Sequence, residues 1–236
     1  ITMTTNTFFG GNYARANGVF GNGSIDVSAL NIANINEKAS LYSKGGIQGA
    51  DTDSKVDLNG YAYLTVSNKG TITRDDNINY AARNDVDIYT KCNVESYGGV
   101  AGAGGNSSAI ASNVVADVTF MNTARSTSQR DTNISAVSNK NVQAYMYART
   151  RGAVSVLNDQ TNAKSNNSVA TVHINGNGQD NEETGNAVIT AYDSINITAM
   201  NTASTIRAKR DSKAYELWFI PYTGKGREYT NNAHSS

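Results

Sequence analysis

The chain has 236 residues, with 20 Lys and Arg against 20 Asp and Glu, and so carries no formal net charge. This balance argues against a nucleic-acid partner, because binding a phosphate backbone requires a basic surface. No apolar run reaches the roughly 18 residues that predict a membrane span. The single cysteine, Cys92, leaves no partner for an intrachain disulfide.

Three segments are expected along the chain. Residues 1–23 are rich in glycine and aromatic residues, and we expect a first coil or an extension there. From residue 24 to residue 222, short runs of alternating apolar and polar residues recur about every 27 residues. Alternation with a period of two is typical of strands that bury one face. Residues 223–236 are expected to be a polar tail or the start of a further coil.

The recurring runs predict an all-β fold, because Gly and Asn interrupt every helical alternative. We predict a parallel β-solenoid with coils of about 27 residues, in which alternate coils resemble each other and form units of about 54. Equivalent strands of successive coils would then stack in parallel. The predicted inward column consists of Val56, Val86, Val114, Val142, Val169 and Ile195.

Catalytic and cofactor-binding motifs are not evident in the sequence. His173 lies in a predicted strand and His234 in the polar tail, without a neighbouring Cys or His that would complete a zinc site. Asp85 and Asp87 share a strand face, and Asp57 is predicted to continue an exposed ladder with Asp87. A solvated face is favoured over a catalytic carboxylate pair. We therefore predict no enzyme activity and no cofactor, and a structural role for Cys92.

Tyrosine is the most informative residue type, with 13 in the chain. Aromatic rings on a flat face can bind sugars through ring faces and hydroxyl groups. Tyr61, Tyr63 and Tyr89 are the candidates for glycan contact. The alternative is that such tyrosines fill corners or form cross-strand pairs.

One loop, residues 175–185, concentrates oxygen ligands. Asn177, Asp180, Glu182 and Glu183 are candidate ligands of calcium, which takes six to eight oxygen atoms. The favoured alternative is a solvated excursion from the fold, so no metal site is predicted.

Residues 98–111 and 122–126 resemble repeats of large bacterial exoproteins, namely filamentous-haemagglutinin-like adhesins and leukotoxin-type proteins. The resemblance extends over residues 24–214. It implies a right-handed β-helix, export to the outside of a bacterial cell, and a role in adhesion or surface structure.

The expected function is therefore a non-catalytic structural or adhesive rod segment, belonging to a longer secreted or cell-surface protein. Its partners would be a host-surface or glycan receptor, or neighbouring copies of itself. Two alternatives stay open. One is a segment of a trimeric phage tail fibre or tailspike, and the other is a carbohydrate-active β-helix enzyme.

Overall fold

The computed structural model describes residues 1–11, 24–68, 71–74, 76–122, 124–176 and 187–216. The described residues form strands and no helix, which confirms the predicted all-β class. The strands are β1 (Thr2–Gly11), β2 (Ile25–Asn68), β3 (Thr71–Arg74), β4 (Ile78–Met121), β5 (Arg125–Ser128), β6 (Thr132–Gly152), β7 (Val154–Gly176), β8 (Val188–Ala191) and β9 (Ile195–Glu216). The predicted tail, residues 223–236, lies outside the described residues.

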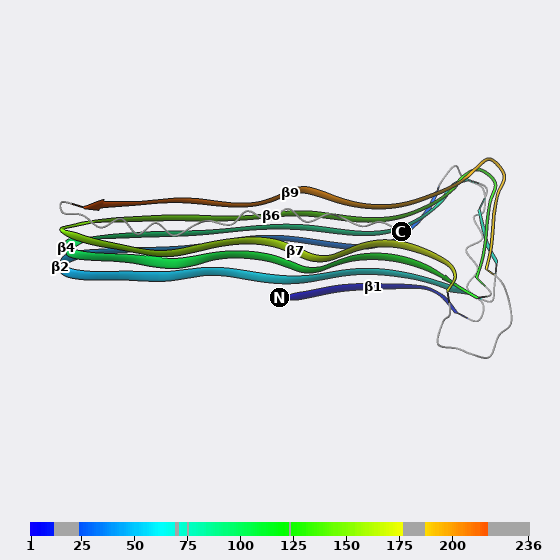
Figure 1. The fold of residues 1–236 in the computed structure, drawn as a ribbon. Coiled ribbons are helices and arrows are strands. Elements are labelled where there is room, and N and C mark those ends of the chain that lie inside the picture. Colours follow the sequence, from blue (N-terminus) through cyan, green and yellow to red (C-terminus); the bar gives the residue numbers. More distant parts are fainter. Residues whose placement is uncertain (12–23, 69–70, 75, 123, 177–186, 217–236) are drawn as a thin grey trace.

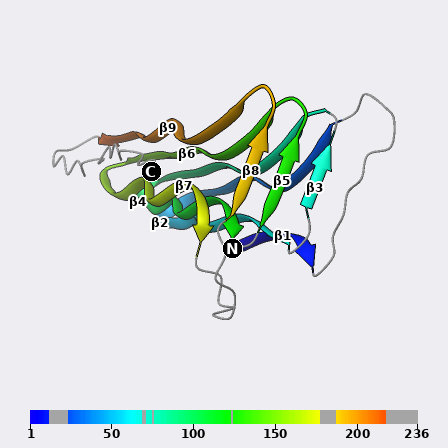
Figure 2. The ribbon, with the colours of Figure 1, turned by 90° about the vertical axis from the view of Figure 1, so that its right-hand side faces the viewer.

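The strands form two parallel sheets. The large sheet has the order β1-β2-β4-β6-β9, and β7 pairs with β4 off this path. The small sheet has the order β3-β5-β8. Every pairing between these strands is parallel, a topology compatible with a β-solenoid. Figure 2 shows the three short strands side by side across one end of the long ones.

The large sheet is folded over into two layers, because β2 and β4 each turn back near their middle (Figure 1). The first half of β4 pairs with β6 and the second half pairs with β7. We call residues 25–45, 78–98, 132–152 and 195–216 the first layer. Residues 2–11, 47–68, 100–121 and 154–176 form the second layer. About 20 residues per strand make each layer roughly 65 Å long at about 3.3 Å per residue.

The two layers meet at a turn end, opposite the short sheet. Gly45, Gly98 and Gly152 lie near this turn on successive strands, and Gly45 pairs with Gly98. A Cβ atom at Gly98 would collide with the carbonyl oxygen of Gly45, and one at Gly152 with that of Gly98. Glycine is required at Gly98 and Gly152 because the backbones of successive strands approach closely at this turn.

Paired residues are separated by about 54 positions. Ile25 is opposite Ile78, which in turn is opposite Thr132. Thr132 is opposite Ile195, a longer separation of 63 positions. None of the described strand pairs joins residues about 27 apart.

The predicted column of inward residues is therefore wrong. Val56 is opposite Ala109 and not Val86, which pairs with Ala33 and Lys140. Val169 belongs to the outer face, where it is opposite Val115. Period-two alternation reports which side chains point inward, but it does not report whether two successive runs stack in one layer or face each other.

The residues of that predicted column face each other across the core instead. Val56 and Val114 lie in the second layer, Val86 and Val142 in the first, and all four belong to one buried cluster. A second cluster near the short sheet contains Tyr80 and Phe120, whose rings meet edge to face with centroids 4.9 Å apart. The two layers thus bury alternate residues against each other, in clusters that follow one another along the strands.

A third cluster, at the turn end, contains Cys92 together with Val94, Met146 and Leu157. Cys92 is a buried free thiol that donates a hydrogen bond to the carbonyl oxygen of Thr52. Burial raises the pKa of the thiol to about 11. A thiol with so high a pKa is a weak nucleophile, which fits the predicted structural role.

Candidate functional site

The predicted glycan-contacting tyrosines lie on two different faces. Tyr61 and Tyr63 are on the outer face of the second layer, where their rings stack with centroids 5.8 Å apart and planes 14° apart. Tyr89 is on the outer face of the first layer, between Asn36 and Gln143. The three tyrosines therefore do not form one site.

The residues weighed as candidate calcium ligands, Asn177, Asp180, Glu182 and Glu183, lie outside the described residues. Within the described ranges, no group of three or more His, Cys, Asp or Glu side chains is arranged to hold a metal ion.

The histidine and the aspartates discussed in the sequence, His173, Asp85 and Asp87, contact polar side chains of their own and neighbouring strands. His173 is exposed, with its Nε2 atom 3.3 Å from Oδ1 of Asp117. Asp85 accepts hydrogen bonds from Arg83 and Asn139. Asp87 accepts one from Asn141. These carboxylates are thus engaged by neighbouring strands.

The predicted ladder between Asp57 and Asp87 is wrong. Asp57 lies in the second layer opposite Ile110, and it accepts a hydrogen bond from Ser112. Asp87 lies in the first layer. The error has the same cause as the misplaced valine column, since runs about 27 residues apart belong to opposite layers.

Rows of asparagine join the strands on both outer faces. In the first layer, Asn79 donates to Asp26, Asn133 to Asn79 and Asn196 to Asn133. In the second layer, the equivalent row consists of Asn59, Asn113 and Asn167. Side-chain amides stacked in register can each donate to one strand and accept from the next. These rows reinforce the observed register.

A basic, tyrosine-rich surface covers the outer face of the first layer toward the turn end. We call it the basic tyrosine face, and it comprises the outward positions of residues 36–44, 89–97, 143–151 and 207–215. It contains eight cationic side chains: Lys38, Lys44, Lys91, Arg149, Arg151, Arg207, Lys209 and Lys213. It contains six tyrosines: Tyr42, Tyr89, Tyr97, Tyr145, Tyr147 and Tyr215. Its two acidic residues are Glu95 and Asp211.

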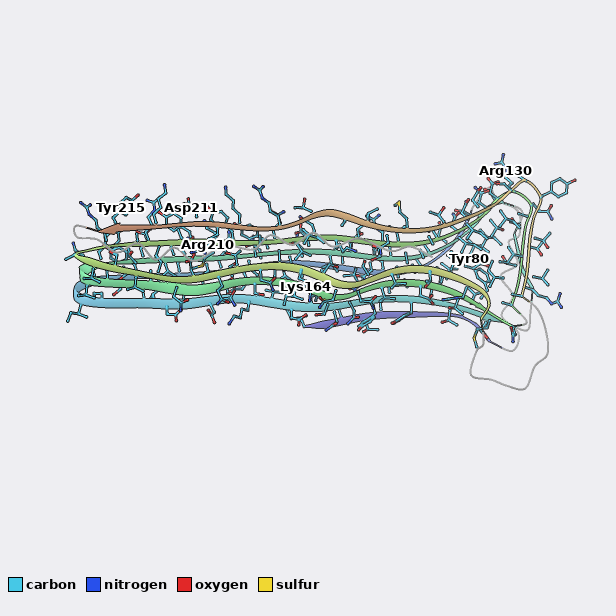
Figure 3. The ribbon with its side chains drawn as sticks, in the orientation of Figure 1. Tyr80, Arg130, Lys164, Arg210, Asp211 and Tyr215 are labelled. Carbon is cyan, nitrogen blue, oxygen red and sulfur yellow. The ribbon has the colours of Figure 1, made fainter. Side chains whose placement is uncertain are left out.

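Cations and rings alternate within this face. The Tyr145 ring lies between Lys91 and Lys209, whose Nζ atoms are 5.5 and 5.6 Å from its centroid. The guanidinium of Arg149 lies 4.5 Å from the centroid of Tyr147. These are cation–π contacts, in which the ring holds the cation near its face. Figure 3 shows Tyr215 and Asp211 projecting outward from β9, whereas Arg210 lies between the layers.

Sequence reasoning found Tyr89 but missed the face to which it belongs. A net charge of zero hides the segregation, because acidic residues outside the face, such as Asp57, Asp85 and Asp117, offset its cations. The available signal was the spacing of Tyr145, Tyr147, Arg149 and Arg151, which alternate with buried residues on one strand. Only the strand register adds the neighbouring rows.

A buried lysine, Lys140, lies in the core between the layers and is 2% exposed. Its Nζ atom donates to Oδ1 of Asn201, at 3.1 Å. That oxygen also accepts a hydrogen bond from Ser168. Burial lowers the pKa of Lys140 from 10.5 to about 8.

Replacing Lys140 with methionine should increase stability at pH 7, because a buried ammonium loses its hydration. Below about pH 8 the amine is protonated in folded and unfolded chains alike. Folding then bears the full free-energy cost of removing the charged ammonium from water. Between pH 8 and 10.5 the unfolded chain binds more protons, so the stability of the wild type rises relative to Lys140→Met. Urea unfolding of both proteins at pH 7 and pH 10 should show that the difference between their unfolding free energies is smaller at pH 10. A constant difference between the two proteins would contradict it, and Lys164→Met, an exposed lysine, is the control.

Comparisons of the chain with protein-family models, curated proteins and solved structures found no match. The resemblance to large bacterial exoproteins therefore stays a prediction. Among the described residues, no helix is long and apolar enough to cross a membrane.

Proposed function

We propose that the chain is a non-catalytic structural and adhesive segment of a large bacterial cell-surface protein. In this proposal it is a parallel β-solenoid whose full coil is the unit of about 54 residues, and it belongs to a longer secreted chain. Parallel pairing of residues 53 or 54 apart supports the coil length. Right-handed winding stays a prediction.

The observation that carries the proposal is the repetition of side chains on two long outer faces. Parallel strands about 4.8 Å apart place equivalent side chains in straight rows. The asparagine rows present the same group on successive strands, and the basic tyrosine face presents cations and tyrosine rings again and again in different rows. A repeated flat surface suits contact with a repeated ligand, such as a glycan chain, through many weak contacts.

Adhesion of coated beads tests the proposed function. Beads that carry the chain should be retained on at least one class of immobilised neutral or acidic glycan, or on cell surfaces. Retention on none of these, and none on beads carrying further copies of the chain, would refute an adhesive role. Cleavage of a bound polysaccharide would favour the enzyme alternative. A mass three times the 25.1 kDa of one chain would favour the trimeric fibre.

A further inference from the structure

We propose that the basic tyrosine face binds a linear polysaccharide bearing carboxylate groups. This inference rests on the adhesive function proposed above and names the chemical class of its ligand. A basic face is compatible with a total charge of zero, because net charge averages over every face of the molecule.

Charge segregation is the first step of the argument. The face holds eight of the 20 Lys and Arg residues of the chain but only two of its 20 acidic residues. On the rest of the first layer's outer face, Asp26, Asp85 and Asp87 outnumber the cation Arg83, which pairs with Asp85. A surface with this excess attracts a polyanion, and the attraction weakens as salt is added.

The contacts between cations and rings are the second step. Lys91 and Lys209 lie over the Tyr145 ring, and Arg149 lies over Tyr147. A cation held against a ring loses less side-chain freedom when it meets an anion. Arginine in addition matches a carboxylate with two parallel hydrogen bonds.

At Tyr145 and Tyr147, the same contacts disfavour the stacking of bases from a single-stranded nucleic acid. Bases bind such proteins by stacking on aromatic ring faces, which must be accessible. Here cations lie over Tyr145 and Tyr147. The phenol hydroxyl of Tyr97 already donates to Glu95 at 2.8 Å, whereas a tyrosine ring with a cation over its face still presents its hydroxyl at the ring edge as a group for sugar hydroxyls.

Row geometry is the third step. Two pairs of cations, Lys38 with Lys91 and Arg149 with Lys213, are direct neighbours on adjacent strands about 4.8 Å apart, and along a strand outward residues recur at about 6.7 Å. Arg149 and Arg151 occupy successive outward positions of β6, and Lys91 and Lys209 flank Tyr145 within one row across the strands. Regularly spaced cations on a flat face suit a chain that repeats its charge from one sugar to the next.

Polygalacturonate and its fully methyl-esterified form provide the decisive pair of ligands, because they share a sugar chain and differ in charge. The wild-type chain should bind polygalacturonate, measured by calorimetry, and should bind the ester at least about tenfold more weakly, the effect of losing hydrogen bonds to charged groups. Equal affinity for the two polymers would overturn the proposal without the need for any variant.

A triple variant locates the binding surface. Arg151→Gln, Arg207→Gln and Lys209→Gln remove three exposed cations from the face and should weaken binding at least about tenfold. The matched control is Lys55→Gln, Arg83→Gln and Lys164→Gln, which removes three exposed cations outside the face. Equal losses in the two triple variants would overturn the assignment. Thermal unfolding of both variants should stay close to that of the wild type, since exposed positions rarely change stability much.

A competition experiment compares duplex DNA with free polygalacturonate as competitors for bound polygalacturonate. If DNA of equal charge concentration displaces polygalacturonate as effectively as free polygalacturonate does, the face recognises charge alone and the carbohydrate assignment fails. Beads that adhere to neutral glycans while polygalacturonate is not bound would refute this inference but leave the adhesive function standing.

Discussion

Replacing Val142 with aspartate should prevent stable folding. Val142 is fully buried, with Ile88 and Ile206 as its strand neighbours, in the cluster that fills the middle of the two layers. An aspartate there would have to lose its hydration or be protonated in an apolar core. We expect a loss of more than about 4 kcal/mol of unfolding free energy, measured by urea unfolding and circular dichroism.

The neighbouring position supplies the control. Gln143 is on the outer face and only partly buried, so Gln143→Asp adds the same charge without desolvating it. We expect that variant to unfold within about 1 kcal/mol of the wild type. Similar stability for Val142→Asp and Gln143→Asp would show that the first layer does not bury its alternate residues.

Removing Asp159 should destabilise the turn end of the molecule by about 3–5 kcal/mol, the usual cost of leaving a buried charge without its partner. Asp159 on β7 and Arg210 on β9 form a bidentate ion pair between the layers, with nitrogen–oxygen distances of 2.7 and 2.6 Å. Their side chains are 0% and 9% exposed. Ser212 donates a further hydrogen bond to the carboxylate.

A double-mutant cycle separates the interaction from the packing. Asp159→Leu alone leaves the Arg210 guanidinium buried and unpaired, whereas Asp159→Leu with Arg210→Met replaces both charges by apolar groups. We expect the double variant to recover most of the lost stability, because buried pairs can often be exchanged for apolar side chains. If urea unfolding shows that the losses of the two single variants simply add, the two groups do not interact in solution.

Much of the strand pattern could be predicted from the sequence. Val56, Val86, Val114 and Val142 were expected to point inward, and all four are buried. The resemblance of runs about 54 residues apart corresponds to the observed pairing separation. Alternation has this predictive power because apolar burial depends on which side of its own strand a residue occupies.

The candidate face was only partly predictable. Tyr89 was named from its place in a strand, but the cations beside it come from strands far away in the sequence. Lys91, Tyr145 and Lys209 form one row only once β4, β6 and β9 are aligned. Net charge averages over every face of the molecule, so it cannot reveal a basic patch on one of them.

The sequence by itself determined that the chain forms strands and which side of each strand is apolar. Local alternation specifies both, because adjacent side chains of a strand point to opposite sides. Tertiary structure alone decided that runs about 27 residues apart face each other across the core, with Val56 and Val86 in opposite layers. The physical reason is that both arrangements bury the same apolar side chains, so their difference lies in strand register and in the turns at Gly45 and Gly98.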